Sequence, residues 1–118
     1  MEEIDLDREY HGSFTVKIDS NRRIMIPCRL HEIYVNRVGE ENLGFLIGIE
    51  RIDEEYLELR DSLPKETEYH RVFKLNLDDK NRFSLSERVI GIAAELFSGA
   101  ESVIVAGHKD HMRVSRND

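Results

Sequence analysis

The chain repeats part of itself, and this repetition restricts its fold more than any other feature. Residues 17–27 read as a strand, a polar turn and a second strand that stops at a proline, and residues 76–86 follow a related pattern. Superposing Asp19 on Asp78 requires a shift of 59 residues, the difference between the two numbers. The same shift aligns His11 with His70, Phe14 with Phe73, Ile18 with Leu77, Arg23 with Arg82, Ile24 with Phe83, Ile26 with Leu85 and Arg29 with Arg88. A match that extends on both sides of the turn indicates an internal duplication.

The composition is that of a soluble globular protein with a modest core. Of the 118 residues, 40% are hydrophobic and 35% are charged, which suits one domain or two small fused halves. The single cysteine, Cys28, excludes an intrachain disulfide and favours a reducing cytosol; we expect it to pack in the core. No apolar run approaches the roughly 18 residues of a membrane span, and residues 1–7 lack the features of a signal peptide. These observations predict a cytoplasmic protein without a membrane partner.

Hydrophobic periodicity predicts the same order of elements in each half: strand, strand, helix, strand, strand. The predicted strands are 14–18, 24–26, 43–49 and 56–59, then 72–77, 82–85, 102–106 and 112–114. One short helix follows Pro27, and a second covers 89–97 and ends at Gly99. The fold class is therefore mainly β with short helices (α+β). We divide the chain into a frayed acidic lead-in (1–11), a first half (12–61), a charged linker (62–68) and a second half (69–118), together one pseudo-symmetric domain.

Each repeated turn carries an aspartate four residues before an arginine: Asp19 before Arg23, and Asp78 before Arg82. An aspartate that opens a turn accepts hydrogen bonds from later amides, and the reversal of the chain brings its carboxylate close to the arginine. A guanidinium held in this way suits bidentate contact with phosphate or with O6 and N7 of guanine. Two interpretations remain open: a structural clamp that closes a hairpin, or a DNA-binding surface.

The charge of the chain gives conflicting indications about a nucleic-acid partner. The net charge is −7, whereas surfaces that bind nucleic acid are usually basic. Acidic residues gather at the N-terminus and between Glu50 and Glu58, while basic residues gather at the repeated stretches: Lys17, Arg22, Arg23 and Arg29, then Lys74, Lys80, Arg82 and Arg88. Because the local field governs docking, a binding surface there is compatible with the total charge. A solvated face of mixed charge is the alternative.

The repeated stretches resemble the MraZ family of bacterial transcription regulators and, more broadly, the swapped-hairpin barrels of the AbrB/SpoVT class. That family carries Asp-x-x-x-Arg twice per chain, and its first copy is matched here by Ile18-Asp19-Ser20, Arg23, Pro27 and Arg29. The segment 103–107, with Met112 and Val114, resembles the closing hairpin of the family's second half. The similarity covers roughly residues 12–115.

This resemblance implies an AbrB-like swapped-hairpin barrel formed from two internal repeats, a homo-oligomer such as a ring, and binding to double-stranded DNA. Carried over residue by residue, the DNA contacts are Arg23 and Arg82, with Lys17, Arg22, Lys80 and Arg29 nearby, and the structural turn residues are Asp19 and Asp78. The family usually has glycine directly before the motif arginine, where this chain has Arg22 and Asn81. Because arginine adopts a left-handed backbone poorly, we expect either a different first turn or Asn21 at the bend.

The remaining reactive side chains do not form a recognisable site. His108 and His111 lack the further ligands of a zinc site, so we expect solvent-facing histidines in a hairpin. The carboxylates between Glu50 and Glu58 predict a charged loop and strand edge. No phosphate loop, nucleophile elbow or Cys–His pair is present, so we expect no enzyme activity, no catalytic residue, no metal and no cofactor.

The sequence therefore predicts a sequence-specific DNA-binding transcriptional regulator that is cytoplasmic and associated with the nucleoid. The alternative, favoured by the negative charge, is a non-catalytic protein-interaction module on the same fold, either antitoxin-like or an assembly subunit.

Overall fold

The fold is known from a computed structural model that describes residues 5–51, 54–65 and 71–117. Parts of several predictions lie outside these residues. They are the start of the acidic lead-in (1–4), the centre of the acidic loop (52–53), the last three residues of the linker (66–68) and the proposed equivalence of His11 with His70. None of the described helices is long and apolar enough to cross a membrane.

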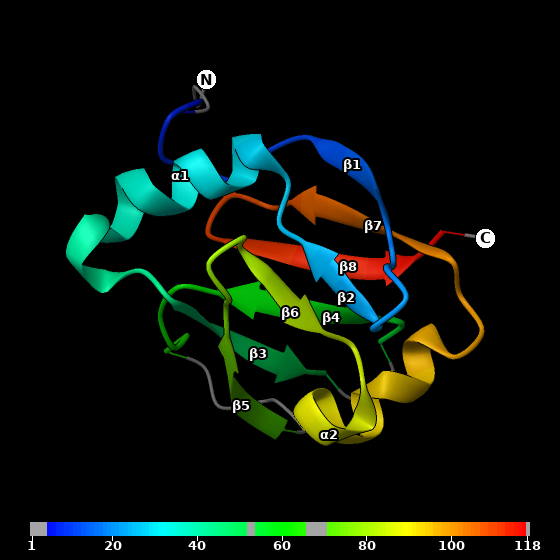
Figure 1. Ribbon diagram of the computed structural model, residues 1–118. Helices are drawn as coiled ribbons and strands as arrows, with labels where there is room; N and C mark the ends of the chain where they lie inside the picture. Colours follow the sequence, from blue (N-terminus) through cyan, green and yellow to red (C-terminus); the bar gives the residue numbers. More distant parts are fainter. Residues whose placement is uncertain (1–4, 52–53, 66–70, 118) are drawn as a thin grey trace.

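A six-stranded antiparallel sheet forms the larger part of the fold (Figure 1). Its strands, in spatial order, are β1 (Ser13–Lys17), β7 (Ser102–Gly107), β8 (His111–Arg116), β4 (Tyr56–Arg60), β3 (Phe45–Glu50) and β5 (Arg71–Asn76). Three of the five pairings, β1 with β7, β4 with β8 and β3 with β5, join a strand before residue 61 to one after residue 69. Exchanging β1–β4 with β5–β8 gives the same order in reverse. The prediction of a mainly β, α+β fold is confirmed at this level.

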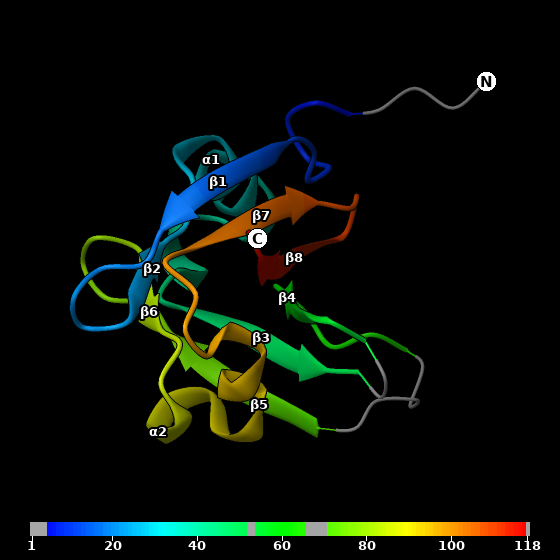
Figure 2. The same ribbon diagram turned by 90° about the vertical axis from the view of Figure 1, so that its right-hand side faces the viewer.

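A second, two-stranded sheet lies in front of the first. It pairs β2 (Arg23–Met25) with β6 (Arg82–Ser84), so that Ile24 stands opposite Phe83. In Figure 1 this ribbon crosses the view between α1 above and α2 below, and Figure 2 shows it at one side of the molecule, between the levels of β1 and β5. Strands β1 and β5 end the six-stranded order, and no described strand pairs one with the other.

The first helix follows the sequence pattern closely. Pro27 precedes α1 (Cys28–Val38), where its fixed φ suits the helix start and its missing N–H has no cost. The buried residues Leu30, Ile33 and Tyr34 recur at helical spacing on one side. Gly39, with a φ of 81°, ends the helix before the short 3-10 turn η1 (Glu40–Asn42). Cys28 is exposed at the start of α1, so the prediction that it packs in the core is wrong.

The second helix differs from its regular sequence pattern. It splits into α2 (Glu87–Ile90) and the 3-10 helix η2 (Gly91–Phe97). The break falls at Gly91, whose φ is 61°. A Cβ on Gly91 would lie 2.7 Å from Nη1 of Arg71, whose guanidinium donates hydrogen bonds to the carbonyl of Ile90 and to Glu50. The guanidinium thus occupies the space that a side chain at position 91 would need, and satisfies a carbonyl at the break.

The core lies between the six-stranded sheet, the ribbon and the helices. Along β4, Leu57 and Leu59 point into it, and their partners on β8, Val114 and Met112, do the same. The ribbon contributes Ile24, at 0% exposure. Because successive strand residues alternate between faces, the other residues of β4 and β8 point to the opposite, outward face of the sheet.

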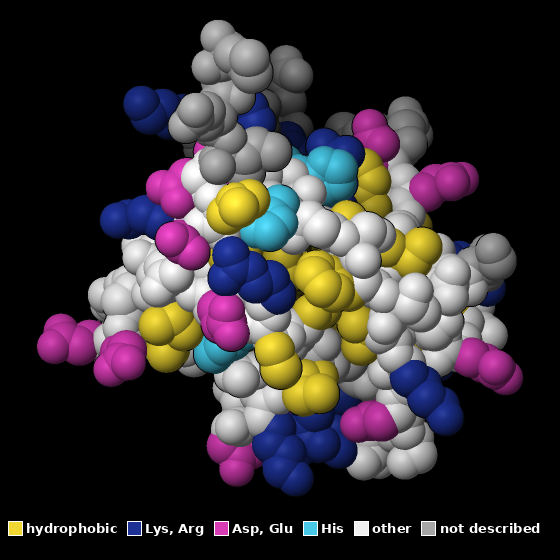
Figure 3. Space-filling view, turned by 90° about the horizontal axis from the view of Figure 1, so that it is seen from above, with side chains coloured by type: hydrophobic (Ala, Val, Ile, Leu, Met, Phe, Trp, Pro, Cys, Tyr) yellow, Lys and Arg dark blue, Asp and Glu magenta, His cyan; other side chains and the backbone are white. Residues whose placement is uncertain are grey.

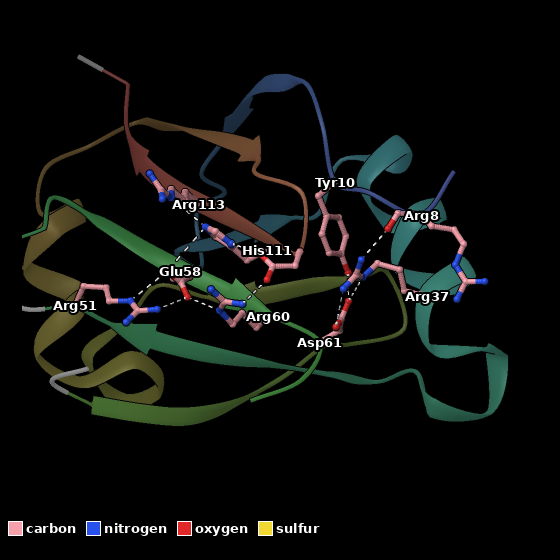
Figure 4. A network of polar contacts seen from close by, with 10 residues as sticks. Arg8, Tyr10, Arg37, Arg51, Glu58, Arg60, Asp61, His111 and Arg113 are labelled. Carbon is pink, nitrogen blue, oxygen red and sulfur yellow. Dashed lines mark hydrogen bonds and ion pairs between the residues drawn. The ribbon is translucent and has the colours of Figure 1, made fainter. Parts of the chain in front are cut away.

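The described part of the lead-in, residues 5–11, is tied to the domain and is not frayed as predicted. Tyr10 is buried and its hydroxyl donates to Asp61 at 2.8 Å, while the guanidinium of Arg37 lies 5.1 Å from its ring (Figure 4). Burial, and then the charge of Asp61, raises the pKa of Tyr10. The backbone of this segment passes so close to β7 that a Cβ at Gly107 would lie 2.2 Å from the amide nitrogen of His11.

A candidate nucleic-acid interface

The first turn, from Asp19 to Arg23, is held by its aspartate. Oδ1 of Asp19 accepts hydrogen bonds from the amides of Asn21 at 2.8 Å and Arg23 at 2.9 Å. Its Oδ2 accepts a third from Nε of Arg23 at 3.1 Å. The hydrogen bond from the Arg23 amide is the main cause that lowers the pKa of Asp19. The carboxylate therefore fixes both the turn and the direction of the arginine side chain.

The second turn, from Asp78 to Arg82, has the same geometry. Oδ1 of Asp78 accepts from the amides of Lys80 and Arg82, each at 2.9 Å, and Oδ2 accepts from Nε of Arg82 at 2.9 Å. Burial acts to raise the pKa of Asp78, but hydrogen bonds from the Arg82 and Lys80 amides outweigh it, and the pKa is lowered. Each of the two turns thus contains the Asp–Arg pair that the sequence suggested.

The two turns also share a left-handed residue immediately before the arginine. Arg22 and Asn81 both have a φ of 60°. Both expectations for the first turn are therefore wrong, because Arg22 itself takes the bend and the turn keeps the shape of the second. The guanidinium of Arg22 donates to the carbonyl of Phe97, the last residue of η2, at 2.7 Å, and to that of Ala100, three residues further on, at 2.9 Å. These two charge-assisted hydrogen bonds offset the free-energy cost, roughly 1–2 kcal/mol, of a left-handed backbone at a residue other than glycine.

The ribbon carries both arginines on its outer face. Ile24 and Phe83 point into the core, so Arg23, Met25, Arg82 and Ser84 point outward. Arg23 stands opposite Ser84, and Met25 stands opposite Arg82, which makes the two arginines diagonal neighbours. Met25 is half exposed between them. The turns therefore lie at opposite ends of one three-residue ribbon and present their arginines on the same side.

Contacts between the halves lock the turns to each other. The amide of Ile26 donates to the carbonyl of Asn81 at 2.9 Å, and the amide of Leu85 donates to that of Arg22 at 2.8 Å. In addition, Nη1 of Arg23 lies 3.9 Å from Oδ2 of Asp78, in the other turn. Each turn is thus completed by the strand that leaves the other one.

The other predicted DNA contacts are less uniform. Lys17, at the end of β1, and Lys80, within the second turn, are both exposed. Arg29, in the first turn of α1, donates to the carbonyl of Leu6 and to Glu32 at 3.1 Å. Arg22 and Arg29 therefore have structural partners, whereas Lys17 and Lys80 remain at the surface near the ribbon. On the face drawn in Figure 3, acidic and basic side chains are interspersed.

The sequence interpretation missed a buried cluster on the outward face of the six-stranded sheet. Glu58 is only 2% exposed; it accepts from Nη2 of Arg51 at 3.0 Å and Nε of Arg60 at 2.5 Å (Figure 4). Burial acts to raise the pKa of Glu58, but the hydrogen bonds from these two arginines lower it overall. The prediction of a merely charged strand edge is therefore wrong at Glu58. The sequence did contain a signal for this cluster: Arg60 lies two residues after Glu58, on the same face of one strand, and Arg51 directly follows the neighbouring strand β3.

The two histidines of the β7–β8 hairpin belong to the same region. His108 is exposed, as predicted, but His111 is buried, with Nδ1 at 2.8 Å from Oδ1 of Asp110. The imidazole rings stack with their centroids 5.6 Å apart. Among the described residues, no group of three or more histidine, cysteine, aspartate or glutamate side chains could hold a metal ion.

Comparison with known proteins adds nothing to this geometry. No protein-family model matches the chain, and no curated protein matches it.

Proposed function

We propose that the chain is a sequence-specific DNA-binding transcriptional regulator of the MraZ/AbrB type. The observation that carries this proposal is the β2–β6 ribbon, on which two braced arginines, Arg23 and Arg82, point outward from one face. The major groove of B-DNA admits a two-stranded β-ribbon, and arginine is the side chain that most often reads guanine there. On this proposal the protein acts in the cytoplasm, at the nucleoid.

The bracing of the arginines suits this role. Each aspartate accepts a hydrogen bond from Nε of its arginine, so the terminal guanidinium nitrogens, of which Nη1 of Arg23 also lies 3.9 Å from Asp78, can donate to phosphate or to a base edge. A side chain that is already oriented loses less conformational entropy on binding. The exposed amines of Lys17 and Lys80 are placed for phosphates beside the groove, while Arg22 acts mainly by holding the first turn.

We also propose that the two halves are repeats that form an AbrB-like swapped-hairpin barrel, and that several copies assemble into a homo-oligomer. A shift of 59 residues carries Arg23–Met25 onto Arg82–Ser84, and it carries α1 onto the residues of α2 and η2. If β1–β4 are exchanged with β5–β8, the order of strands in the six-stranded sheet is the same, read in reverse. Because one short ribbon reads few base pairs, several ribbons on a repeated DNA element would supply the specificity.

The test is a fluorescence anisotropy titration with duplex DNA from upstream of the protein's own gene, at several salt concentrations. The variant R23A/R82A should weaken binding at least about 30-fold, because each bidentate arginine contributes about 1–3 kcal/mol. The control K65A/K74A removes the same charge from exposed lysines outside the ribbon and should retain most of the affinity. Equal losses in the two double variants, with both proteins folded by circular dichroism, would contradict the proposal.

The net charge of −7 favours a second candidate, a non-catalytic module that binds a basic protein. The exposed Met25 at the centre of the ribbon face is compatible with such a contact. Absence of DNA retention at low salt, together with a stoichiometric basic partner recovered with the full chain, would support this candidate and contradict the first.

A further inference from the structure

A hollow of about 740 Å³ opens on the outward face of the six-stranded sheet. Its half-buried lining comes from three strands and η2, and includes Tyr56, Leu96, Ala106, Arg113 and Ser115. The exposed carboxylates of Glu54 and Glu55 stand at its rim. The volume is that of a small-molecule site. The ribbon packs on the opposite, core-facing side of this sheet, so the hollow is separate from the candidate DNA interface.

Arg113 lines this hollow and lies beside the cluster of Glu58, Arg51 and Arg60. It stands opposite Glu58 in the β4–β8 register, but the Glu58 carboxylate already accepts hydrogen bonds from Arg51 and Arg60. Nε of Arg113 instead donates to Nε2 of His111, at 3.1 Å. Within the described part of the chain, no carboxylate forms an ion pair with Arg113. In Figure 4 its guanidinium points away from Glu58, whereas those of Arg51 and Arg60 point toward it.

The guanidinium of Arg113 is also held in place. Its central carbon lies 4.4 Å from the centroid of the Tyr56 ring, and the hydrogen bond to His111 fixes the other side. His111 in turn stacks on His108 and contacts Asp110. A partly buried cation that is fixed by stacking, with terminal N–H groups left over, is a ready donor for an anion.

We propose that this hollow binds a small organic anion, with its carboxylate or phosphate on Arg113 and Ser115 and its apolar body against Tyr56, Leu96 and Ala106. The fork of arginine matches either anion, and the ring, leucine and alanine provide apolar contact. The two carboxylates at the rim repel an extended polyanion more strongly than a single small anion, which favours small ligands over nucleic acid at this site. Its occupancy does not depend on the ribbon.

The test is an NMR titration of the full ¹⁵N-labelled chain with benzoate, phenyl phosphate and inorganic phosphate as separate probes. Benzoate or phenyl phosphate should shift amide signals at 104–107 and 113–116 and leave the β2–β6 ribbon unchanged. Tighter binding of one aryl probe identifies the preferred anion, and inorganic phosphate should bind more weakly because it lacks an apolar body. Arg113→Gln should weaken aryl-probe binding about tenfold or more, since it removes a charge-assisted hydrogen bond.

Two further variants keep the test decisive. Lys74→Gln removes another cation that lies over an aromatic ring on the same outward face, 4.7 Å from the Phe45 centroid, and should leave aryl-probe binding unchanged. Ala106→Leu places a larger side chain where the apolar body of the ligand would lie, without altering a charge, and should weaken aryl-probe binding even if Arg113→Gln fails to fold. Undiminished binding in Ala106→Leu, or shifts that centre on the ribbon, would overturn the site.

Discussion

The two turns of the ribbon have one geometry and two different chemical settings. Between residues 17 and 23 the first turn has three bases, Lys17, Arg22 and Arg23, against one acid. Between residues 76 and 82 the second has two bases and two acids: Asp79 replaces Ser20, Asn76 and Asn81 replace Lys17 and Arg22, and Lys80 replaces Asn21. Arg22 is fixed by hydrogen bonds to the carbonyls of Phe97 and Ala100, while Asn81 holds the same left-handed backbone with a short side chain. The aspartate and the left-handed residue therefore define the turn, and the other side chains set its charge and its attachment.

The sharpest way to separate the turns is to remove one arginine at a time. Arg23→Ala and Arg82→Ala should each weaken DNA binding about 10- to 100-fold, because each removes one bidentate contact. We expect the larger loss for Arg23→Ala, since the first turn has the greater positive charge and approaches DNA more favourably. Anisotropy titrations of both variants on one duplex at fixed salt measure this difference. A larger loss of DNA affinity for Arg82→Ala than for Arg23→Ala would contradict the expected order of the two turns.

The next effect concerns stability and the attachment of the first turn. Arg22→Ala should lower the free energy of unfolding by about 2 kcal/mol, because it removes both hydrogen bonds to Phe97 and Ala100 and keeps the left-handed strain. Asn81→Ala should cost no more than about 1 kcal/mol, the difference in left-handed preference. Urea denaturation followed by circular dichroism measures both values. Equal destabilisation would show that the Arg22 hydrogen bonds contribute little.

A smaller effect should follow from exchanging the charges of the turns. Asp79→Ser gives the second turn the residue of the first and should tighten DNA binding about two- to fivefold, the range of a screened surface charge. Ser20→Asp is the matched reverse change and should weaken binding by a similar factor. Both effects should shrink as salt is added. A change that persists at high salt would point to an altered turn shape.

The smallest effect is the acid dependence of the two carboxylates. The pKa of Asp19 and that of Asp78 are lowered in the folded protein, mainly through hydrogen bonds from backbone amides. Their contribution to stability is therefore complete above the pKa of an unfolded aspartate, about 3.9, and is lost as pH falls through the folded-state pKa. In D19N/D78N the urea midpoint should decline less between pH 5 and pH 2 than in the wild type. Parallel curves for the two proteins would show that other groups control acid unfolding.

The sequence was informative where the deciding contacts are local. Alternating apolar residues located the strands, and the four-residue spacing of Asp19 and Arg23 predicted their pairing. Distant contacts were not predictable in this way. Arg22 could adopt its bend because its acceptors, Phe97 and Ala100, lie 75 and 78 residues further along the chain. The second helix breaks at Gly91 because the guanidinium of Arg71, on β5, occupies the space that a side chain at position 91 would need.

The buried cluster illustrates a second limit. A glutamate on the outward face of a strand normally remains solvated, so a sequence pattern assigns it to the surface. Glu58 is buried because guanidinium groups from its own strand and from the end of β3 close over it.

The reciprocal backbone bonds from Ile26 to Asn81 and from Leu85 to Arg22 have a consequence for the folding of each half. In each turn the carbonyl of the left-handed residue is bonded by an amide of the other half, so a fragment such as residues 12–61 would need a second copy of itself to supply that strand. Expressed alone, that fragment should behave as an intertwined dimer that dissociates and unfolds in one concentration-dependent step. In the full chain both turns belong to one polypeptide, so each turn receives its partner strand without a second molecule.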